Sequence, residues 1–276
     1  MNDIKFSVSM CVYGGDNAAW FKTAVNSILN QTAIPDEIVL VVDGPVPSEL
    51  NKIILQYEKD PLFNVIRFEK NQGHGIARRA GLKACTNELV AIMDADDISS
   101  SDRFEKQLDI FRSFNHIDIV GGNITEFVDS PENVVGSREV PCENSAIREY
   151  MKTRCPMNLV TVMFKKSSVE AVGGFIDWYC EEDYYLWLRM AMANQHFANI
   201  SDILVNVRVG NDMYQRRGGL KYFRSEAKLQ QYMLDQHIIG IGTYCMNILK
   251  RLIVQVLLPN QVRGWVFKTF ARKQVK

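Results

Sequence analysis

The sequence predicts an α/β protein built on a doubly wound, mostly parallel sheet. Short apolar runs rich in Val and Ile, at 7–12, 37–42, 64–68 and 88–94, are typical of strands buried on both faces. Segments with apolar residues at helical spacing lie between these runs. A strand–helix–strand pattern that occurs three times indicates such a sheet, and it places ligands beyond the carboxyl ends of the strands.

Each predicted helix of the first hundred residues has one apolar face. These faces consist of Phe21, Ala24, Val25 and Ile28, of Leu50, Ile53, Ile54 and Tyr57, and of Ile76, Ala80 and Ala84. Farther along, we expect a helix over 102–114, two strands within IDIVGGNITEFVD (117–129), and further strands at 160–164 and 200–209. Helices are expected at the C-terminal end.

Composition excludes several classes of protein. The 276 residues include 47% hydrophobic and 23% charged residues, which fits an ordinary globular protein. Basic and acidic residues balance at 32 each, so the overall charge gives no reason to expect a nucleic-acid partner. The six cysteines include no CxxC pair, and reduced thiols are expected. The apolar run near the N-terminus is too short for a signal peptide or a membrane span, so we expect a cytoplasmic protein.

The last part of the chain is basic and apolar. No acidic residue follows Asp235, whereas seven Lys and Arg residues do. Segment 244–258 fits an amphipathic helix that lies on a membrane surface. It fits equally well a helix packed on the main domain with solvated lysines.

Three carboxylates crowd into the run MDADD, directly after the strand predicted at 88–94. Asp94, Asp96 and Asp97 would repel one another unless they are protonated or share a cation. Mg²⁺ takes one or two protein carboxylates and leaves its other positions to water and phosphates, so an Asp-x-Asp loop suits it. The alternative is a solvent-exposed turn in which Asp97 or Ser99 caps the following helix.

Four sequence blocks occur in order: SVSMCVYGG, VVDGP, NQGHGIARRAGLKACTNELVAIMDADD, and GGF followed by EEDYYLWLRM. Over roughly residues 5–210 the chain resembles the inverting glycosyltransferase family 2, whose members have the GT-A nucleotide-diphospho-sugar fold. The resemblance implies a catalytic domain at 1–217, with a nucleotide-binding half at 1–100 and an acceptor-binding half at 101–217. It leaves 218–276 as a helical, basic and apolar segment near a membrane.

By position, the resemblance assigns residues to the donor site. Tyr13 is expected to form a wall of the uracil pocket. Asp43 is expected to accept a hydrogen bond from the uracil imide N–H, a donor that cytosine lacks. Arg78 is expected near the base or the diphosphate, and the alternative is a surface arginine beside Arg79.

The resemblance also implies a metal and a base. Asp94 and Asp96 match the DXD motif that binds Mn²⁺ or Mg²⁺, with Asp96 the more direct ligand and Asp97 in support. The catalytic base of the family lies in a Glu-Asp motif, which corresponds here to Glu182 and Asp183. We assign the base to Asp183, and the alternative for either acid is simple N-terminal capping of a helix. After the last strand, three arginines can hold a diphosphate or lie in an exposed loop: Arg208, Arg216 and Arg217.

The predicted activity is that of a hexosyltransferase. UDP-galactose and UDP-glucose are the favoured donors, and the acceptor is expected to be a saccharide on a polyprenyl diphosphate. The resemblance is to bacterial enzymes of O-antigen, capsule or exopolysaccharide synthesis, which implies peripheral contact with the cytoplasmic face of the inner membrane. The alternative function is a non-catalytic scaffold in a polysaccharide assembly complex. A dehydrogenase is disfavoured because YGGDNAAW, after the first predicted strand, lacks the dinucleotide-binding glycine fingerprint.

Overall fold

The computed structural model describes residues 4–210 and 218–259. These residues form a nine-stranded sheet in the order β3-β2-β1-β4-β8-β6-β9-β5, with β7 paired to β6. The strands are β1 (Phe6–Tyr13), β2 (Glu37–Asp43), β3 (Phe63–Arg67), β4 (Leu89–Asp94), β5 (Ile98–Ser99), β6 (Ile119–Phe127), β7 (Val134–Arg138), β8 (Met163–Lys165) and β9 (Phe197–Arg208). The helices are α1 (Ala18–Leu29), α2 (Ser48–Tyr57), α3 (His74–Ala84), α4 (Arg103–Ser113), α5 (Asn144–Tyr150), α6 (Lys166–Ala171), α7 (Glu182–Met192), α9 (Leu220–Asp235) and α10 (Ile241–Arg251), with a 3-10 turn η1 (Leu159–Thr161) and a π-helical segment η2 (Leu252–Leu257).

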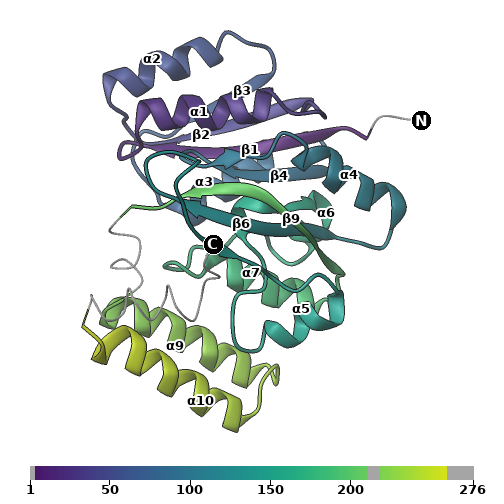
Figure 1. Ribbon diagram of the computed structural model, residues 1–276, viewed down its shortest axis with the longest axis vertical. Coiled ribbons are helices and arrows are strands. Elements are labelled where there is room, and N and C mark those ends of the chain that lie inside the picture. Colours follow the sequence, from purple (N-terminus) through teal and green to yellow (C-terminus); the bar gives the residue numbers. More distant parts are fainter. Residues whose placement is uncertain (1–3, 211–217, 260–276) are drawn as a thin grey trace.

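Helices cover both faces of the sheet, as Figure 1 shows. One hydrophobic core joins the sheet to α1, α2 and α4, and a second joins its other face to α3, α6, α7 and α9. Strand β1 pairs in parallel with β2 and β4, and β2 pairs in parallel with β3. The predicted doubly wound, mostly parallel α/β fold is therefore confirmed, and the carboxyl ends of β1, β2 and β4 meet at one edge.

The segment 117–129 forms one strand, so the prediction of two strands there was wrong. Gly121 and Gly122 resemble a turn in the sequence, but they lie inside β6, which pairs in parallel with β9. An added Cβ at Gly121 would lie 2.5 Å from Asn199 Oδ1, and one at Gly122 would lie 2.5 Å from Leu204 Cδ1. The glycines therefore allow a close approach of β9 and do not end the strand.

Two other local expectations need correction. Residues 160–164 do not form a single strand, because η1 precedes the short strand β8. Helix α4 begins at Arg103, while Ser99 belongs to β5. Neither Asp97 nor Ser99 therefore caps the following helix.

The two C-terminal helices pack on the domain, beyond α7 (Figure 1). Leu229 and Met233 of α9 have no exposed surface and belong to the same core as Trp187 of α7. Helix α10 and η2 pack in turn against α9. Over the described residues, no helix is long and apolar enough to cross a membrane. The predicted domain boundary at 217 falls outside the described residues.

Candidate active site

A cavity of about 360 Å³ lies at the edge where β1, β2 and β4 end. Its volume is that of a small-molecule site. The five residues predicted to hold a nucleotide-sugar all line it: Tyr13, Asp43, Arg78, Asp94 and Asp96. Three of them are the last residues of their strands, which explains how positions far apart in sequence converge.

Aromatic side chains form one wall of the cavity. The Tyr13 ring is 40% exposed and lies edge-to-face with the His74 ring, with 6.4 Å between their centroids. An added Cβ at Gly15 would lie 2.5 Å from the Tyr13 hydroxyl oxygen, so a larger residue there would displace the Tyr13 ring. The Tyr13 ring therefore folds back over the turn that follows β1, where a planar base can pack against it.

The carboxylate of Asp43 is buried and is held by backbone N–H groups. Its two oxygens accept hydrogen bonds from the backbone N–H groups of Gln72 (2.7 Å) and Gly73 (3.0 Å), at the start of α3. Gly44 and Gly73 have φ values of +89° and +93°, which favour glycine. A carboxylate has about four acceptor positions, so Asp43 retains capacity for one more donor from the cavity.

Arg78 is a buried cavity residue, so the alternative of a surface arginine was wrong. It is 6% exposed, and its guanidinium donates to Asp94 Oδ1 at 3.0 Å. Neighbouring Arg79 points elsewhere and donates to the Phe175 carbonyl. The Arg78–Asp94 pair therefore forms a charged wall between the β4 end and α3.

Arg208 holds the loop after β4 through two hydrogen bonds. Its backbone N–H donates to Asp97 Oδ1 at 2.8 Å, and its Nε donates to the Asp96 carbonyl at 3.2 Å. The guanidinium lies between the rings of Trp20 and Phe127, at 4.7 and 4.6 Å from their centroids. Asp97 is 3% exposed and supports the loop outside the cavity lining, whereas Asp96 lines the cavity. The other two predicted arginines, at 216 and 217, lie outside the described residues.

Carboxylates in the cavity repel one another. Burial raises the pKa of Asp16 to about 6, and the charges of Asp96 and Asp94 add to that shift. Among residues 4–210 and 218–259, no three His, Cys, Asp or Glu side chains form a ready-made metal cluster. Mg²⁺ bound together with a diphosphate needs only one or two carboxylates. Asp94 and Asp96 therefore fit such a cation, and Asp96 is the better placed because Asp94 also pairs with Arg78.

The predicted catalytic acids open α7, beside the cavity. Asp183 Oδ1 accepts from the Tyr184 N–H at 2.6 Å, and Oδ2 lies 3.7 Å from the Cys155 sulfur. Burial raises the pKa of Glu182 to about 7, where the charge of Asp183 adds to the shift and that of Arg78 opposes it. Burial also raises the pKa of Asp183, which the Tyr184 N–H and Arg78 oppose. Arg78 therefore acts on both the donor cavity and the acidic pair.

Two aromatic residues that line the cavity, Trp20 and His74, were missed from the sequence, and Asp16 was placed at the strand ends without a role. Asp16 accepts from the Tyr13 N–H at 2.8 Å and fixes the turn after β1. His74 is the first residue of α3, directly after the glycine that binds Asp43. Only Asp16 lies just after a strand end, whereas Trp20 and His74 lie in the first turns of α1 and α3.

The chain matches the model of Glycosyl transferase family 2 over residues 7–173. This match covers more than half of the chain. The chain belongs to this family. As a family 2 glycosyltransferase it is an enzyme, and the predicted family and enzyme class are confirmed.

Two bacterial relatives resemble this glycosyltransferase along nearly their whole length. A "UDP-Gal:alpha-D-GlcNAc-diphosphoundecaprenol beta-1,3-galactosyltransferase" of Escherichia coli is 36% identical over 269 residues, which cover 98% of this chain and 97% of the relative. The "Amylovoran biosynthesis glycosyltransferase AmsE" of Erwinia amylovora is 32% identical over 263 residues, which cover 95% of this chain and 98% of the relative.

Solved structures show the same fold. S. aureus TarS in complex with UDP-GlcNAc has a TM-score of 0.66 at 17% identity, covering 91% of this chain and 73% of TarS. The mannosyltransferase PcManGT from Pyrobaculum calidifontis, in complex with GDP-Man and Mn²⁺, has a TM-score of 0.62 at 17% identity, covering 94% of this chain and 71% of that one. The GT-A fold of this glycosyltransferase is thereby confirmed.

Proposed function

We propose that this glycosyltransferase moves a hexose from a UDP-sugar to a saccharide on a polyprenyl diphosphate, with inversion at the anomeric carbon. One observation carries the proposal. The cavity brings the predicted donor-binding residues together, and Arg78 connects them electrostatically to the acidic pair at the start of α7.

The proposed nucleotide is UDP because of Asp43. Its carboxylate can only accept hydrogen bonds, and uracil presents an imide N–H where cytosine presents none. Galactose is the first candidate sugar, since the E. coli relative is named for UDP-Gal, and glucose is the second. The name of the same relative supports a saccharide on a lipid diphosphate as the acceptor. The reaction would then take place at the cytoplasmic face of the inner membrane.

In the proposed reaction, an acceptor hydroxyl oxygen attacks the anomeric carbon as the bond from that carbon to the UDP oxygen breaks. Asp183 takes the hydroxyl proton, and the attack from the opposite side inverts the configuration. Mn²⁺ or Mg²⁺ held by Asp96 and Asp94 would supply positive charge to the diphosphate. Arg78 holds Asp94 in place and favours the charged form of Asp183.

Calorimetric titration of UDP, with GDP and CDP as controls, tests the donor site. We expect micromolar-range binding of UDP in the presence of Mn²⁺, little binding without metal, and loss of binding in Asp96→Ala. Binding of CDP as tight as that of UDP would argue against the role of Asp43. If no nucleotide binds under either condition, the donor site is wrongly assigned.

Turnover tests the reaction itself. UDP-galactose and UDP-glucose would be supplied with an α-linked GlcNAc-diphosphate lipid, and the linkage of the product would be determined by NMR. A β-linked product from the α-linked donor is the expected result, and an α-linked product would contradict inversion. Nucleotide binding without transfer to any saccharide acceptor would indicate a scaffold.

A further inference from the structure

The most deeply buried side chains of α10 and η2 are polar, although Tyr244 also packs against the core, while several of their most exposed side chains are apolar. Asn247, Arg251 and Gln255 follow one another at four-residue spacing on the inner side, and Asn247 and Gln255 are 2% and 4% exposed. On the outer side, Leu249 is 53% exposed and Leu257 is 65% exposed. A helix that faces water normally has the reverse arrangement.

The inner contacts fix this orientation. The Asn247 amide donates to the Gln230 side chain at 2.8 Å. Arg251 Nε lies 3.2 Å from a carboxylate oxygen of Glu226, and the Gln255 amide donates to the other oxygen. Rotation of the helix would leave these buried polar groups without partners, at a cost of about 1–3 kcal/mol for each group.

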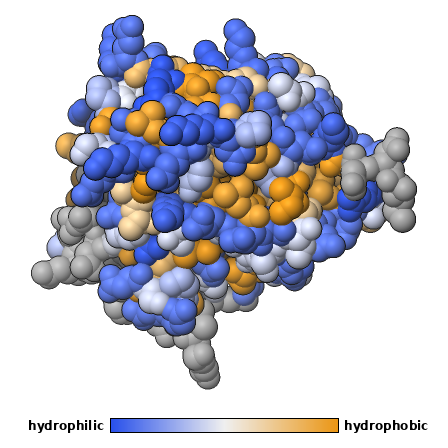
Figure 2. All heavy atoms as spheres, turned by 90° about the horizontal axis from the view of Figure 1, so that it is seen from above, coloured by the Kyte–Doolittle hydropathy of each residue, from blue (hydrophilic) through white to orange (hydrophobic). Residues whose placement is uncertain are grey.

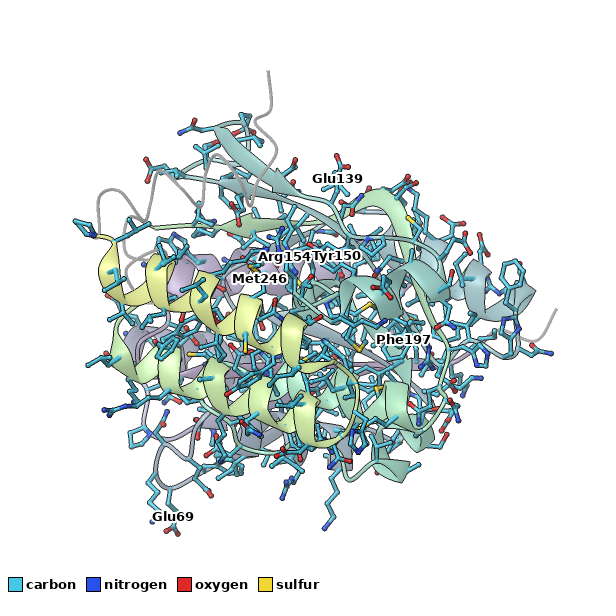
Figure 3. All side chains as sticks on the ribbon, turned by 90° about the horizontal axis from the view of Figure 1, so that it is seen from below. Glu69, Glu139, Tyr150, Arg154, Phe197 and Met246 are labelled. Atoms are coloured by element: carbon cyan, nitrogen blue, oxygen red, sulfur yellow. The ribbon has the colours of Figure 1, made fainter. Side chains whose placement is uncertain are left out.

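The outer face forms a continuous row, which we call the outer stripe. It consists of Ile241, Met246, Leu249, Ile253 and Leu257, all at least 40% exposed. Figure 3 shows the face of the molecule that α9 and α10 form, with Met246 labelled on it. At the opposite end, hydrophobic residues also lie in patches among hydrophilic ones (Figure 2), so exposure alone does not distinguish the stripe. The stripe is distinguished by the buried polar side chains on the opposite side of the same helix.

Basic side chains lie within the outer stripe and beside it. Lys250 is exposed within it. The turn at 152–154 contacts α10 through backbone carbonyls, and its exposed Arg154 lies near Met246 in Figure 3. No Asp or Glu follows Asp235 in the sequence.

We propose that the outer stripe docks on an anionic lipid surface, with α10 and η2 lying parallel to it. The apolar side chains would enter the boundary between headgroups and acyl chains, and the basic ones would contact anionic headgroups. A second copy of the chain is a poorer occupant, because pairing two stripes would bring basic side chains together.

The position of the stripe suits a lipid-borne acceptor. Glu181, directly before the proposed catalytic pair, is 4% exposed. Burial raises its pKa, where the charge of Glu226 adds to the shift and that of Arg251 opposes it. The loop before this pair also contacts α9, because the Ser225 hydroxyl donates to the Tyr179 carbonyl at 2.6 Å. The helix pair that carries the stripe therefore packs beside the proposed catalytic motif. This step rests on the proposed function, whereas the docking surface does not.

Vesicle co-sedimentation of the full chain tests the proposal. The probes are vesicles of phosphatidylglycerol and phosphatidylcholine in equal parts, and vesicles of phosphatidylcholine alone. The test variant is Leu249→Gln with Ile253→Gln. Its matched control is Leu55→Gln with Ile34→Gln, at two residues outside the stripe. Leu55 is 44% exposed and matches Ile253 at 40%, and Ile34 is 54% exposed and matches Leu249 at 53%.

We expect the wild type and the control to bind the anionic vesicles, more weakly at high salt, and the stripe variant to bind at least about tenfold more weakly. UDP titration should give the same affinity for all three proteins, which separates docking from the donor site. Equal binding by the stripe variant and the wild type would overturn the proposal, as would no binding by the wild type. A dimer that the stripe variant dissociates, without vesicle binding, would assign the stripe to a second copy.

Discussion

The carboxylate of Asp183 has the surroundings that a general base needs. It is held by the Tyr184 N–H, lies near the Cys155 thiol, and has a raised pKa. A pKa closer to neutral makes a carboxylate a stronger proton acceptor. The neighbouring Glu182 has a similar environment, so the two acids must be separated by experiment.

The variant Asp183→Asn is expected to lower kcat by roughly 10²–10⁴-fold, because an amide cannot accept the acceptor proton. UDP binding should change little, since Asp183 does not line the donor cavity. Steady-state kinetics and UDP titration measure the two effects. A larger loss of kcat in Glu182→Gln than in Asp183→Asn would move the base to Glu182.

Arg208 predicts a different kind of defect. Its guanidinium packs against the Trp20 and Phe127 rings and donates to the Asp96 carbonyl. The variant Arg208→Ala should therefore loosen the loop that carries Asp96. We expect UDP affinity in the presence of Mn²⁺ to fall about tenfold, which is about 1.4 kcal/mol and lies within the range of about 0.5–2 kcal/mol for a cation–π contact. Arg208→Lys should lose part of this, because lysine lacks the planar donor pair. Calorimetry that shows unchanged affinity in Arg208→Ala would contradict the role.

Residues of the site were predictable to different degrees. Tyr13, Asp43 and Asp94 end strands that share one edge of the sheet, so strand prediction alone brought them together. His74 and Trp20 start helices, and which of their side chains turns toward the cavity depends on how α1 and α3 pack. The place of Arg208 between two rings depends on the pairing of β6 with β9, which no local pattern indicates.

At the scale of single elements, glycine explains the wrong prediction of two strands within 117–129. Gly121 and Gly122 are typical of a turn, yet they lie within β6 because β9 and its side chains come too close for a Cβ. Helix α10 illustrates the opposite case. Its amphipathic period was visible in the sequence, but the side that faces the protein depends on buried partners in α9 and the 152–154 turn.

The polar face of α10 gives a stability prediction. Asn247→Ala removes hydrogen bonds to Gln230 and the Lys152 carbonyl and leaves both buried groups short of a partner. The free energy of unfolding should fall by about 1–3 kcal/mol. Leu249→Ala on the outer side of the same helix is the control and should stay within about 0.5 kcal/mol of wild type. Urea unfolding followed by circular dichroism measures both, and equal losses would mean that the helix is oriented differently.

For the whole molecule, the proposed catalytic pair predicts an activity that depends on pH near neutrality. Glu182 has a pKa of about 7 and interacts with Asp183, whose pKa is also raised. Because the proposed base must be deprotonated and the pKa of Asp183 is raised, kcat/KM should still rise with pH above the usual carboxyl range. Glu182→Gln removes one negative charge beside Asp183, so this limb should move to lower pH. A profile that is flat across neutrality would contradict the prediction.

Stability should respond to pH with the opposite sign. A carboxyl whose pKa is raised on folding binds its proton more tightly in the native state. The contribution of Glu182 to stability is therefore fully present below its ordinary value of 4.5 and is lost as the pH rises through about 7. The conditions that favour turnover are those in which this site destabilises the fold.

The packing of α9 also has a practical consequence. Leu229 and Met233 fill the core beneath α7, the helix that begins with the proposed catalytic pair. A shortened protein that ends at residue 217 would leave an apolar hole next to that helix and expose the core to water. Such a fragment should express poorly and aggregate, even though the family match ends at residue 173 and every proposed catalytic residue would still be present.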